Sequence, residues 1–360
     1  EGISQEAISL AGHLKLNNLI LIYDNNNISI DGSTDLAFSD NTNLRFKSVN
    51  WEVHSGKGHD HKNIYKLLKK AQVSKVPCLL NFKTTIGFGS PNKSAKASSH
   101  GSPLGSEEVK LTRSKLSWNE KPFQIPDKLL KIWRNSSTKN LQIYKKTKSI
   151  SHTNLSNKDI DNLFNKIETD LKDFKSDQAT RKSSEAILNY FKEDHPILGG
   201  SADLTGSNNT KGKEMSVMDS MNTTGQYIHY GVREHGMAAI MNGIAATKIY
   251  KTYSGTFLSF ADYMKPSLRL AALMKINPIQ VFTHDSIGLG EDGPTHQPIE
   301  QINMLRLIPN SYVFRPCDLK ETIVCWREAL KINDSPSFIC LSRQNLPQIS
   351  NKKLDSKKFR

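Results

Sequence analysis

Short, continuous apolar runs recur along the chain and predict buried β-strands. Segments with apolar positions at helical spacing lie between these runs. The strands are expected at residues 19–23, 78–82, 196–200, 279–282, 312–314 and 338–341. The helices are expected at residues 63–73, 181–191, 234–250, 260–275 and 319–330. Because alternating strands and helices favour parallel sheets covered by helices on both faces, the pattern predicts an α/β protein.

The middle of the chain breaks this alternation. Residues 120–165 are rich in Lys, Asn and Ser, and only residues 125–133 have a helical pattern. We therefore expect a mostly irregular interdomain linker. The predicted division is a first domain at 1–120, a basic linker at 121–165 and a second domain at 166–360. A chain of 360 residues is long enough for two such domains.

The positive charge of the chain is concentrated near this linker. The formal net charge is +14, and residues 110–158 hold twelve Lys or Arg side chains against two acids. Basic linkers are usually solvated, and no zinc-finger, helix-turn-helix or aromatic-basic RNA motif accompanies this one. No apolar run approaches the roughly 20 residues of a membrane helix. We expect neither a nucleic-acid nor a membrane partner.

The cysteines bear on the cellular location of the protein, and the first residues bear on whether the sequence is a fragment. Cys78, Cys317, Cys325 and Cys340 show no C-x-x-C spacing, which is typical of reduced thiols in a cytoplasmic protein. The chain opens without methionine, in what resembles the middle of an element. We expect it to be a fragment.

Two polar loops follow predicted strands, where ligands bind in open α/β sheets. The first, DNNNISID at residues 24–31, offers carboxylate, amide and carbonyl oxygens suited to Mg²⁺ and phosphate, or it is an Asn-rich turn. The second, THDSIGLGEDGPTHQP at residues 283–298, suits a metal site, a phosphate cradle or a polar loop. Its histidines are twelve residues apart without a third ligand at helical spacing, which disfavours zinc.

Three further motifs each allow a structural and a functional interpretation. Glu234 in HYGVREHG is either a helix cap or a buried acid that hydrogen-bonds a cofactor ring. Phe257, Phe260 and Tyr263 have helical spacing, which is more typical of a core than of a cofactor pocket. GGSADLTGSN at residues 199–208 has the composition of a phosphate loop, which is a weak signal alone.

Taken together and in order, six motifs closely resemble the transketolase family. They are YDNNNISIDG, KTTIGFGSPNK, GGSADLTGSN, YIHYGVREHGM, THDSIGLGEDGPTHQPIEQ and LSRQNLP. The resemblance covers nearly the whole chain apart from the linker. It implies two thiamine-diphosphate-binding-fold domains with parallel sheets flanked by helices, the first for the pyrophosphate and the second for the pyrimidine. It also implies a cytoplasmic homodimer with active sites at its interface.

The resemblance implies a two-carbon ketol transfer of the non-oxidative pentose phosphate pathway. The donor is a ketose phosphate such as xylulose 5-phosphate, and the acceptor is an aldose phosphate such as ribose 5-phosphate or erythrose 4-phosphate. The transfer proceeds through a thiamine-diphosphate carbanion. The implied metal is Mg²⁺, with Ca²⁺ or another divalent cation as an alternative, held by Asn26 and the carbonyl of Ile28.

The resemblance also assigns site residues. Glu234 hydrogen-bonds the aminopyrimidine ring and takes part in proton removal, with a tuned pKa. The other residues at the cofactor are Glu1, Asp203, Phe257, Phe260 and Tyr263. The acceptor phosphate is bound by Arg181, Ser207, His284 and Arg343. Asp292 binds a sugar hydroxyl, and His100 and His296 lie near the reacting oxygens as catalytic residues, as does His284.

The chain departs from the family pattern in a few places. Ala97 replaces a frequent histidine, and Gly206 replaces a proline. The family's Gly-Asp-Gly metal motif would lie just before Glu1, and its C-terminal domain after Arg360. We therefore expect this segment alone to be inactive.

Overall fold

A computed structural model describes residues 2–147, 155–174, 176–193 and 195–349, without the side chains of residues 139, 146 and 147. Its internal contacts divide the chain into two compact units. The first unit comprises residues 8–151, and the second comprises residues 1–7 and 152–360. None of the helices described is both long and apolar enough to span a bilayer.

The first unit is built on a parallel sheet in the order β1-β3-β2. Helix α3 packs on one face, over Cys78, Leu80 and Phe82. The other face is covered by the end of α1 and by α2, where Phe46 and Trp51 pack edge to face. The elements are α1 (Gln5–His13), β1 (Ile20–Asn25), η2 (Thr34–Leu36), α2 (Thr42–Ser48), β2 (Glu52–Lys57), α3 (His61–Ala71), β3 (Cys78–Lys83), η3 (Ala97–Ser99), α4 (Ser106–Lys115) and α5 (Asp127–Thr147).

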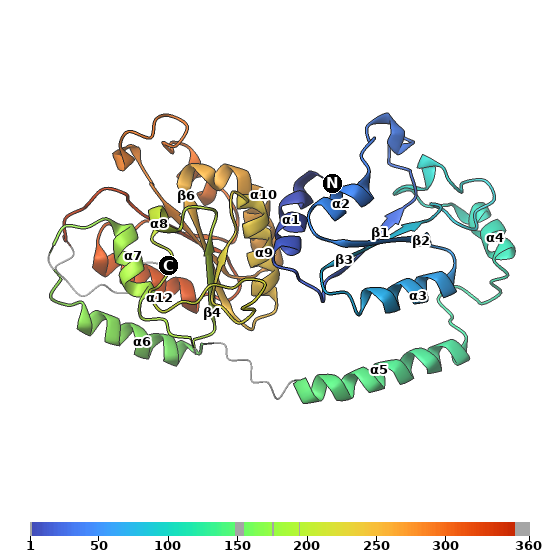
Figure 1. Ribbon diagram of the computed structural model, residues 1–360, viewed down its shortest axis with the longest axis horizontal. Coiled ribbons are helices and arrows are strands. Elements are labelled where there is room, and N and C mark those ends of the chain that lie inside the picture. The colour runs from blue at the N-terminus through green and yellow to red at the C-terminus, as the bar shows by residue number, and fades with distance from the viewer. Residues whose placement is uncertain (1, 148–154, 175, 194, 350–360) are drawn as a thin grey trace. The chain divides into compact units, whose positions relative to one another are not determined.

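The second unit has a larger parallel sheet in the order β5-β4-β6-β7-β9-β8. Figure 1 shows α9 and α10 on one side of its strands and α7 and α12 on the other. The elements are η1 (Gly2–Ser4), α6 (Asn157–Asp170), α7 (Thr180–Leu188), β4 (Ile197–Ser201), α8 (Thr205–Asn208), β5 (Tyr227–His229), α9 (Glu234–Ala246), β6 (Lys251–Phe257), η4 (Leu258–Phe260), α10 (Ala261–Met274), β7 (Pro278–Thr283), η5 (Ile287–Leu289), α11 (Gln301–Arg306), β8 (Tyr312–Phe314), α12 (Leu319–Lys331) and β9 (Ser337–Cys340).

The core of the second unit lies between its sheet and the α6–α7–α12 layer. Trp326 of α12 is fully buried there, packs edge to face on Tyr253 and donates its indole N–H to Ser184 Oγ at 2.9 Å. Phe164 and Ile167 of α6 join the same cluster. This packing fixes the strands whose carboxyl ends carry the candidate site.

The expected α/β architecture with parallel sheets flanked by helices is confirmed, but the expected irregular linker is wrong. Helix α5 extends well beyond the predicted patch at 125–133, and α6 begins at Asn157 behind a Ser156–Asp159 capping box. Composition misled here, because amphipathic periodicity and caps form a helix even where Lys and Asn are abundant.

Candidate functional site

The loops after the strands of the second unit meet at one edge of its sheet. All neighbouring strands are parallel, so every strand directs its carboxyl end to that edge. Asp203 follows β4, Glu234 follows β5, Phe260 follows β6, His284 follows β7 and Arg343 follows β9. The parallel topology thus brings together residues that are far apart in the sequence. They meet at the carboxyl ends of the strands, which is where ligands bind to such sheets.

Glu234 lies in a cleft of about 700 Å³. It is the first residue of α9 and is 7% exposed. Burial raises the pKa of this carboxyl, and the nearby acids Glu6 and Asp203 raise it further. A carboxyl with a raised pKa can retain a proton and share it with a ring nitrogen. The cleft is lined by Ile3, Glu6, Ala202, Asp203, Leu204, Val232, Glu234, His235, Phe260, Asp262, Tyr263 and Pro266.

Aromatic rings connect this cleft to the loop after β7. Phe257 stacks on Phe260 with centroids 5.7 Å apart, and the Phe260 and Tyr263 centroids are 5.9 Å apart. The ring of His284 lies 3.7 Å from that of Phe257, and His296 lies 5.2 Å from Phe260. Despite their helical spacing, the three rings do not share one helix: Phe257 ends β6, Phe260 ends η4 and Tyr263 lies in α10.

His284 is the centre of a cationic cluster. It is 3% exposed and adopts the left-handed backbone region with φ +58°, and its Nδ1 is 2.8 Å from Thr283 Oγ1. Its pKa is lowered to about 4, first by burial and then by the charges of Arg181, Arg343 and His296. Burial and Arg343 also lower the pKa of Arg181. These shifts indicate positive groups gathered around a largely dry histidine.

The cationic cluster retains unused donor capacity. Arg181 Nη1 donates to the Ser207 carbonyl at 2.5 Å, whereas its buried Nε has no hydrogen-bond partner among the described residues. Arg343 Nη2 lies 3.7 Å from Glu291 Oε1, a weak contact with an exposed acid. Since a buried unpaired donor is costly, this arrangement fits a bound anion with several oxygens, such as a phosphate.

The candidate metal residues lie in the first unit, in the loop after β1. Asn26 Oδ1 accepts from the backbone N–H of Ile28 at 2.9 Å, and Asn27 has φ +62°. The backbone hydrogen bonds that close the turn involve Asn27 and Ser29, which leaves the Ile28 carbonyl outside them. Asn26 Oδ1 and the Ile28 carbonyl are neutral oxygens of the same loop, the ligand type that Mg²⁺ accepts when phosphate supplies charge.

His100 lies in a second loop of the first unit, which Glu108 stabilises. His100 is exposed at the end of η3. The Glu108 carboxylate accepts from Ser90 Oγ and from the backbone and side-chain N–H groups of Asn92, at 2.8 and 2.9 Å for the latter two. These bonds lower the pKa of Glu108 to about 2. Glu108 therefore anchors the start of the loop that carries His100.

Comparison with known proteins identifies the family. Residues 1–166 match the family described as "Transketolase, thiamine diphosphate binding domain", and residues 176–348 match "Transketolase, pyrimidine binding domain". Transketolase from Buchnera aphidicola subsp. Baizongia pistaciae is 45% identical over 370 residues, covering 97% of this chain and 55% of its own length. This chain belongs to the transketolase family.

Solved structures agree with that assignment. Transketolase from Campylobacter jejuni is 43% identical, with a TM-score of 0.87 over 99% of this chain and 56% of its own. Pichia stipitis transketolase in complex with sedoheptulose 7-phosphate is 38% identical, with a TM-score of 0.87 over 98% of this chain and 56% of its own. The chain spans about half the length of the curated relatives it matches.

The predicted site residues fall into both transketolase domains. The second unit brings together Asp203, Glu234, Phe260 and Tyr263 around the cleft. It gathers Arg181, Arg343, His284 and His296 around the cationic cluster, with the Ser207 carbonyl bonded to Arg181. Asp292 is exposed. Glu1 lies outside the described residues.

Glu6 is a residue of this transketolase cleft that sequence reasoning missed. Its Oε2 accepts from the backbone N–H of Gly236 at 2.6 Å, and it raises the pKa of Glu234. A Cβ on Gly236 would meet Glu6 at 2.9 Å, so the glycine permits this close approach. Only tertiary structure places residue 6 beside residue 236.

We predict that Glu108→Ala loosens the His100 loop at neutral pH. Because folding lowers the pKa of Glu108, its contribution is present above the ordinary glutamate value and is lost as pH falls through about 2. Amide hydrogen exchange in residues 84–105 should rise in the variant at pH 7. Glu107→Ala is the matched control, since Glu107 is exposed and its carboxylate lies 2.8 Å from Nζ of the exposed Lys110. Equal exchange in the two variants would contradict the prediction.

Proposed function

We propose that the protein is a transketolase that transfers a two-carbon ketol unit from a ketose phosphate to an aldose phosphate. The observation that carries the proposal is the continuity of two sites along one sheet edge. Phe260 lines the cleft of the buried acid Glu234 and packs on Phe257, which in turn packs on His284 of the cationic cluster. A cofactor ring and a substrate phosphate therefore have adjacent places.

Thiamine diphosphate fits the cleft by shape and donor chemistry. Phe257, Phe260 and Tyr263 provide apolar rings for a flat heterocycle, and Glu234 provides a carboxyl able to donate to a ring nitrogen. Asp203, with φ +59°, borders the same cleft. Bound thiamine diphosphate supplies the carbon nucleophile and the electron sink for carbon–carbon bond cleavage. Glu234 holds and moves the proton at its carboxyl, and the apolar walls exclude water.

The metal and cofactor assignments extend to the first unit and to Glu1. Asn26 Oδ1 and the Ile28 carbonyl hold Mg²⁺, with Ca²⁺ or another divalent cation as alternatives, alongside diphosphate oxygens. The neutral oxygens leave the cation's charge to be balanced by the diphosphate. The proposed role of Glu1 at the cofactor rests on the family resemblance alone.

The substrate is held at the cationic cluster. Arg181, Arg343, His284 and Ser207 bind the acceptor phosphate, because guanidinium groups match phosphate geometry and the cluster has unpaired donors. The low pKa of His284 keeps its imidazole neutral at pH 7, so it can give one directed hydrogen bond. A relative has been solved with sedoheptulose 7-phosphate, which supports a phosphosugar here.

The remaining residues act on the sugar chain. We propose that Asp292 binds a hydroxyl and that His296 and His100 hold or move protons near the reacting oxygens. His296 is partly buried against Phe260, and its Nδ1 is 2.9 Å from Thr295 Oγ1, which directs Nε2 away from that hydroxyl. Of the four residues that the resemblance assigns to catalysis, Glu234, His100 and His296 handle protons, whereas His284 contributes by binding the acceptor phosphate.

Assembly, organisation and location complete the proposal. Family membership supports a homodimer with active sites at its interface. We propose functional domains at 1–120 and 166–360 joined by residues 121–165. A cytoplasmic location is supported by Cys78, Cys317, Cys325 and Cys340, all free thiols with pKa values raised chiefly by burial.

A coupled assay tests the proposed function. The full-length protein, with Mg²⁺ and thiamine diphosphate, is given xylulose 5-phosphate and ribose 5-phosphate. We expect glyceraldehyde 3-phosphate to form only when both sugars and the cofactor are present. Absence of this product, with a folded protein that binds the cofactor, would overturn ketol transfer and favour another thiamine-diphosphate reaction.

A further inference from the structure

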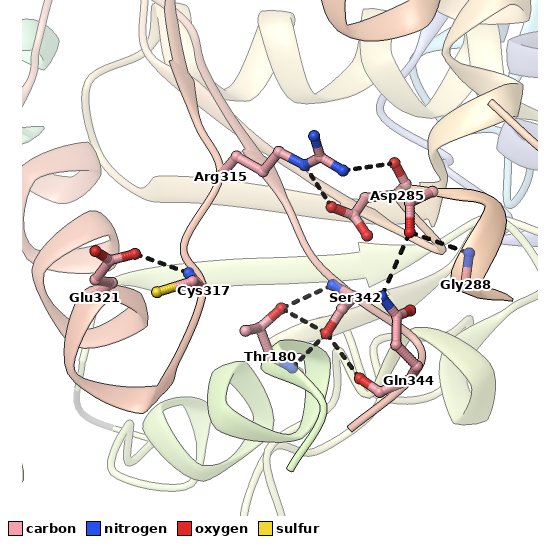
Figure 2. A network of polar contacts seen from close by, with 9 residues as sticks. Thr180, Asp285, Gly288, Arg315, Cys317, Glu321, Ser342 and Gln344 are labelled. Atoms are coloured by element: carbon pink, nitrogen blue, oxygen red, sulfur yellow. Dashed lines mark hydrogen bonds and ion pairs between the residues drawn. The ribbon is translucent and has the colours of Figure 1, made fainter. Parts of the chain in front are cut away.

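A network of polar contacts lies beside the residues that carry the cationic cluster. Figure 2 shows its members arranged around the segments that follow β7 and β9 and the start of α7. Three of the cluster residues have a sequence neighbour in this network: Thr180 precedes Arg181, Asp285 follows His284, and Ser342 and Gln344 flank Arg343. The network residues are therefore next to the cluster residues in the sequence. None of them is itself a proposed phosphate ligand.

Thr180 and Ser342 fix the two arginines relative to each other. Thr180 N–H donates to Ser342 Oγ at 3.0 Å, and Ser342 N–H donates to Thr180 Oγ1 at 2.7 Å. Both residues are almost completely buried. These reciprocal bonds join the segment after β9 to the N-terminus of α7. The backbones that carry Arg181 and Arg343 are therefore held in a fixed relative position.

Gln344 connects the Arg343 segment to the loop after β7. Its Nε2 donates to Ser286 Oγ at 3.4 Å, and the same oxygen accepts from Gly288 N–H at 3.3 Å (Figure 2). A Cβ on Gly288 would lie 2.7 Å from the Gln344 side chain. The glutamine therefore fills the space that this glycine leaves, and it holds the loop close to Arg343.

Arg315 fixes the residue after His284. Its Nε lies 2.7 Å from Asp285 Oδ2, and its Nη2 is 3.4 Å from the Asp285 carbonyl. Asp285 is 8% exposed, whereas the Arg315 side chain is about half exposed at the end of β8. One guanidinium thus holds both the side chain and the backbone of Asp285.

His284 needs such support because of its backbone. A non-glycine residue with φ +58° occupies a sparsely populated region, which persists only when its surroundings hold it. Asp285 is the next residue, so a rotation of the backbone at Asp285 would carry the His284 imidazole away from Arg181 and Arg343. The Arg315 contact to the Asp285 carbonyl opposes that rotation.

We propose that Arg315 is a positioning residue that sets the preference for phosphorylated acceptors, an inference that rests on the proposed function. Arg315 acts through Asp285 on the orientation of His284 in the phosphate site. It has no role at Glu234 or the cofactor cleft. Loss of Arg315 therefore weakens phosphate recognition and leaves the ketol-transfer chemistry intact.

The test compares one acceptor with and without its phosphate. The full-length Arg315→Met variant is assayed with the unphosphorylated donor hydroxypyruvate and with either ribose 5-phosphate or D-ribose. We expect KM for ribose 5-phosphate to rise about tenfold, because a displaced phosphate ligand loses alignment, while kcat/KM for D-ribose stays unchanged. Arg315→Lys should recover part of the loss, since it keeps the charge but not the two-point contact.

Two controls separate positioning from general destabilisation. Arg327→Met removes another ion pair of the second unit, Arg327 Nη2 to Glu168 Oε1 at 3.0 Å, and should leave the acceptor preference unchanged. If Arg315→Met does not fold, Asp285→Asn provides the same comparison without a buried unpaired charge. Protection by inorganic phosphate against thermal unfolding gives a readout that does not depend on turnover. This protection should be weaker in Arg315→Met than in the parent protein.

The outcomes distinguish this inference from the proposed function. Arg181→Met should lose the preference for ribose 5-phosphate. If it does not, the phosphate site itself is wrong. If Arg181→Met loses the preference while Arg315→Met and Asp285→Asn keep it, the phosphate site stands and the positioning role of Arg315 is refuted. An equal loss with both acceptors would also refute it.

Discussion

Replacing Glu234 with alanine in the full-length protein is expected to lower kcat by about 10²–10⁴-fold, the range typical of a lost proton-transfer group. The carboxyl is buried at the start of α9 and faces the cleft of Phe260 and Tyr263. Because burial and the neighbouring acids Glu6 and Asp203 raise its pKa, it is suited to hold a proton on a cofactor ring. Alanine removes that proton without crowding the cleft.

The same pKa shift predicts how Glu234 affects stability. Folding raises its pKa, so its favourable contribution is present below the unfolded-state value and is lost as pH rises through the folded-state value. At neutral pH, where the carboxyl is ionised in the unfolded chain, the raised pKa is therefore a cost to the fold. Glu234→Gln, which has no charge to bury, should melt at least as high as the parent protein while turning over as slowly as Glu234→Ala.

Activity and melting temperature, measured together, decide this prediction. Glu193→Gln is the matched control, because Glu193 is an exposed acid before β4, at the opposite end of that strand from the cleft. The control should keep full activity. Wild-type turnover in both Glu234 variants would remove the acid from the mechanism, and a large fall in melting temperature would make the loss of activity structural.

The hydrophobic pattern predicted strands that are mostly apolar and missed strands with a polar sequence. The runs at 78–82 and 279–282 correspond to β3 and β7. Strand β6, with the sequence KTYSGTF, is fully buried yet reads as polar. Its polar groups find distant partners: Tyr253 Oη donates to the Thr210 carbonyl, and Lys251 Nζ donates to Asn333 Oδ1. Such partners cannot be seen in a local sequence window.

The motifs gave the identity of candidate residues but not their geometry. The left-handed backbone of His284, the approach of Glu6 to Gly236 and the Arg315–Asp285 pair all depend on contacts between segments far apart in sequence. Even the low pKa of His284 follows from burial beside Arg181 and Arg343. Residue types at fixed spacing therefore indicate which chemistry is available, whereas the folded sheet edge determines which residues share it.

Asn26→Ala is expected to raise the Mg²⁺ concentration needed for cofactor binding by at least about 10–100-fold, the loss that follows removal of even an outer-shell partner of a metal. Asn26 has two functions in the loop after β1. Its Oδ1 is a proposed ligand, and the same oxygen accepts from Ile28 N–H at 2.9 Å, which helps to orient Ile28, the residue whose carbonyl is the other proposed ligand. Alanine removes both at once.

The neighbouring asparagine provides the matched control. Asn27 has φ +62° and an exposed side chain, so Asn27→Gly keeps the left-handed turn and removes only the amide. Titration of the full-length protein with Mg²⁺ at fixed thiamine diphosphate, after chelation, measures the metal requirement directly. Asn27→Gly should match the parent protein. If Asn26→Ala matches it as well, the cation is held elsewhere; if both variants lose affinity equally, the loop's conformation matters and the Asn26 amide is no ligand.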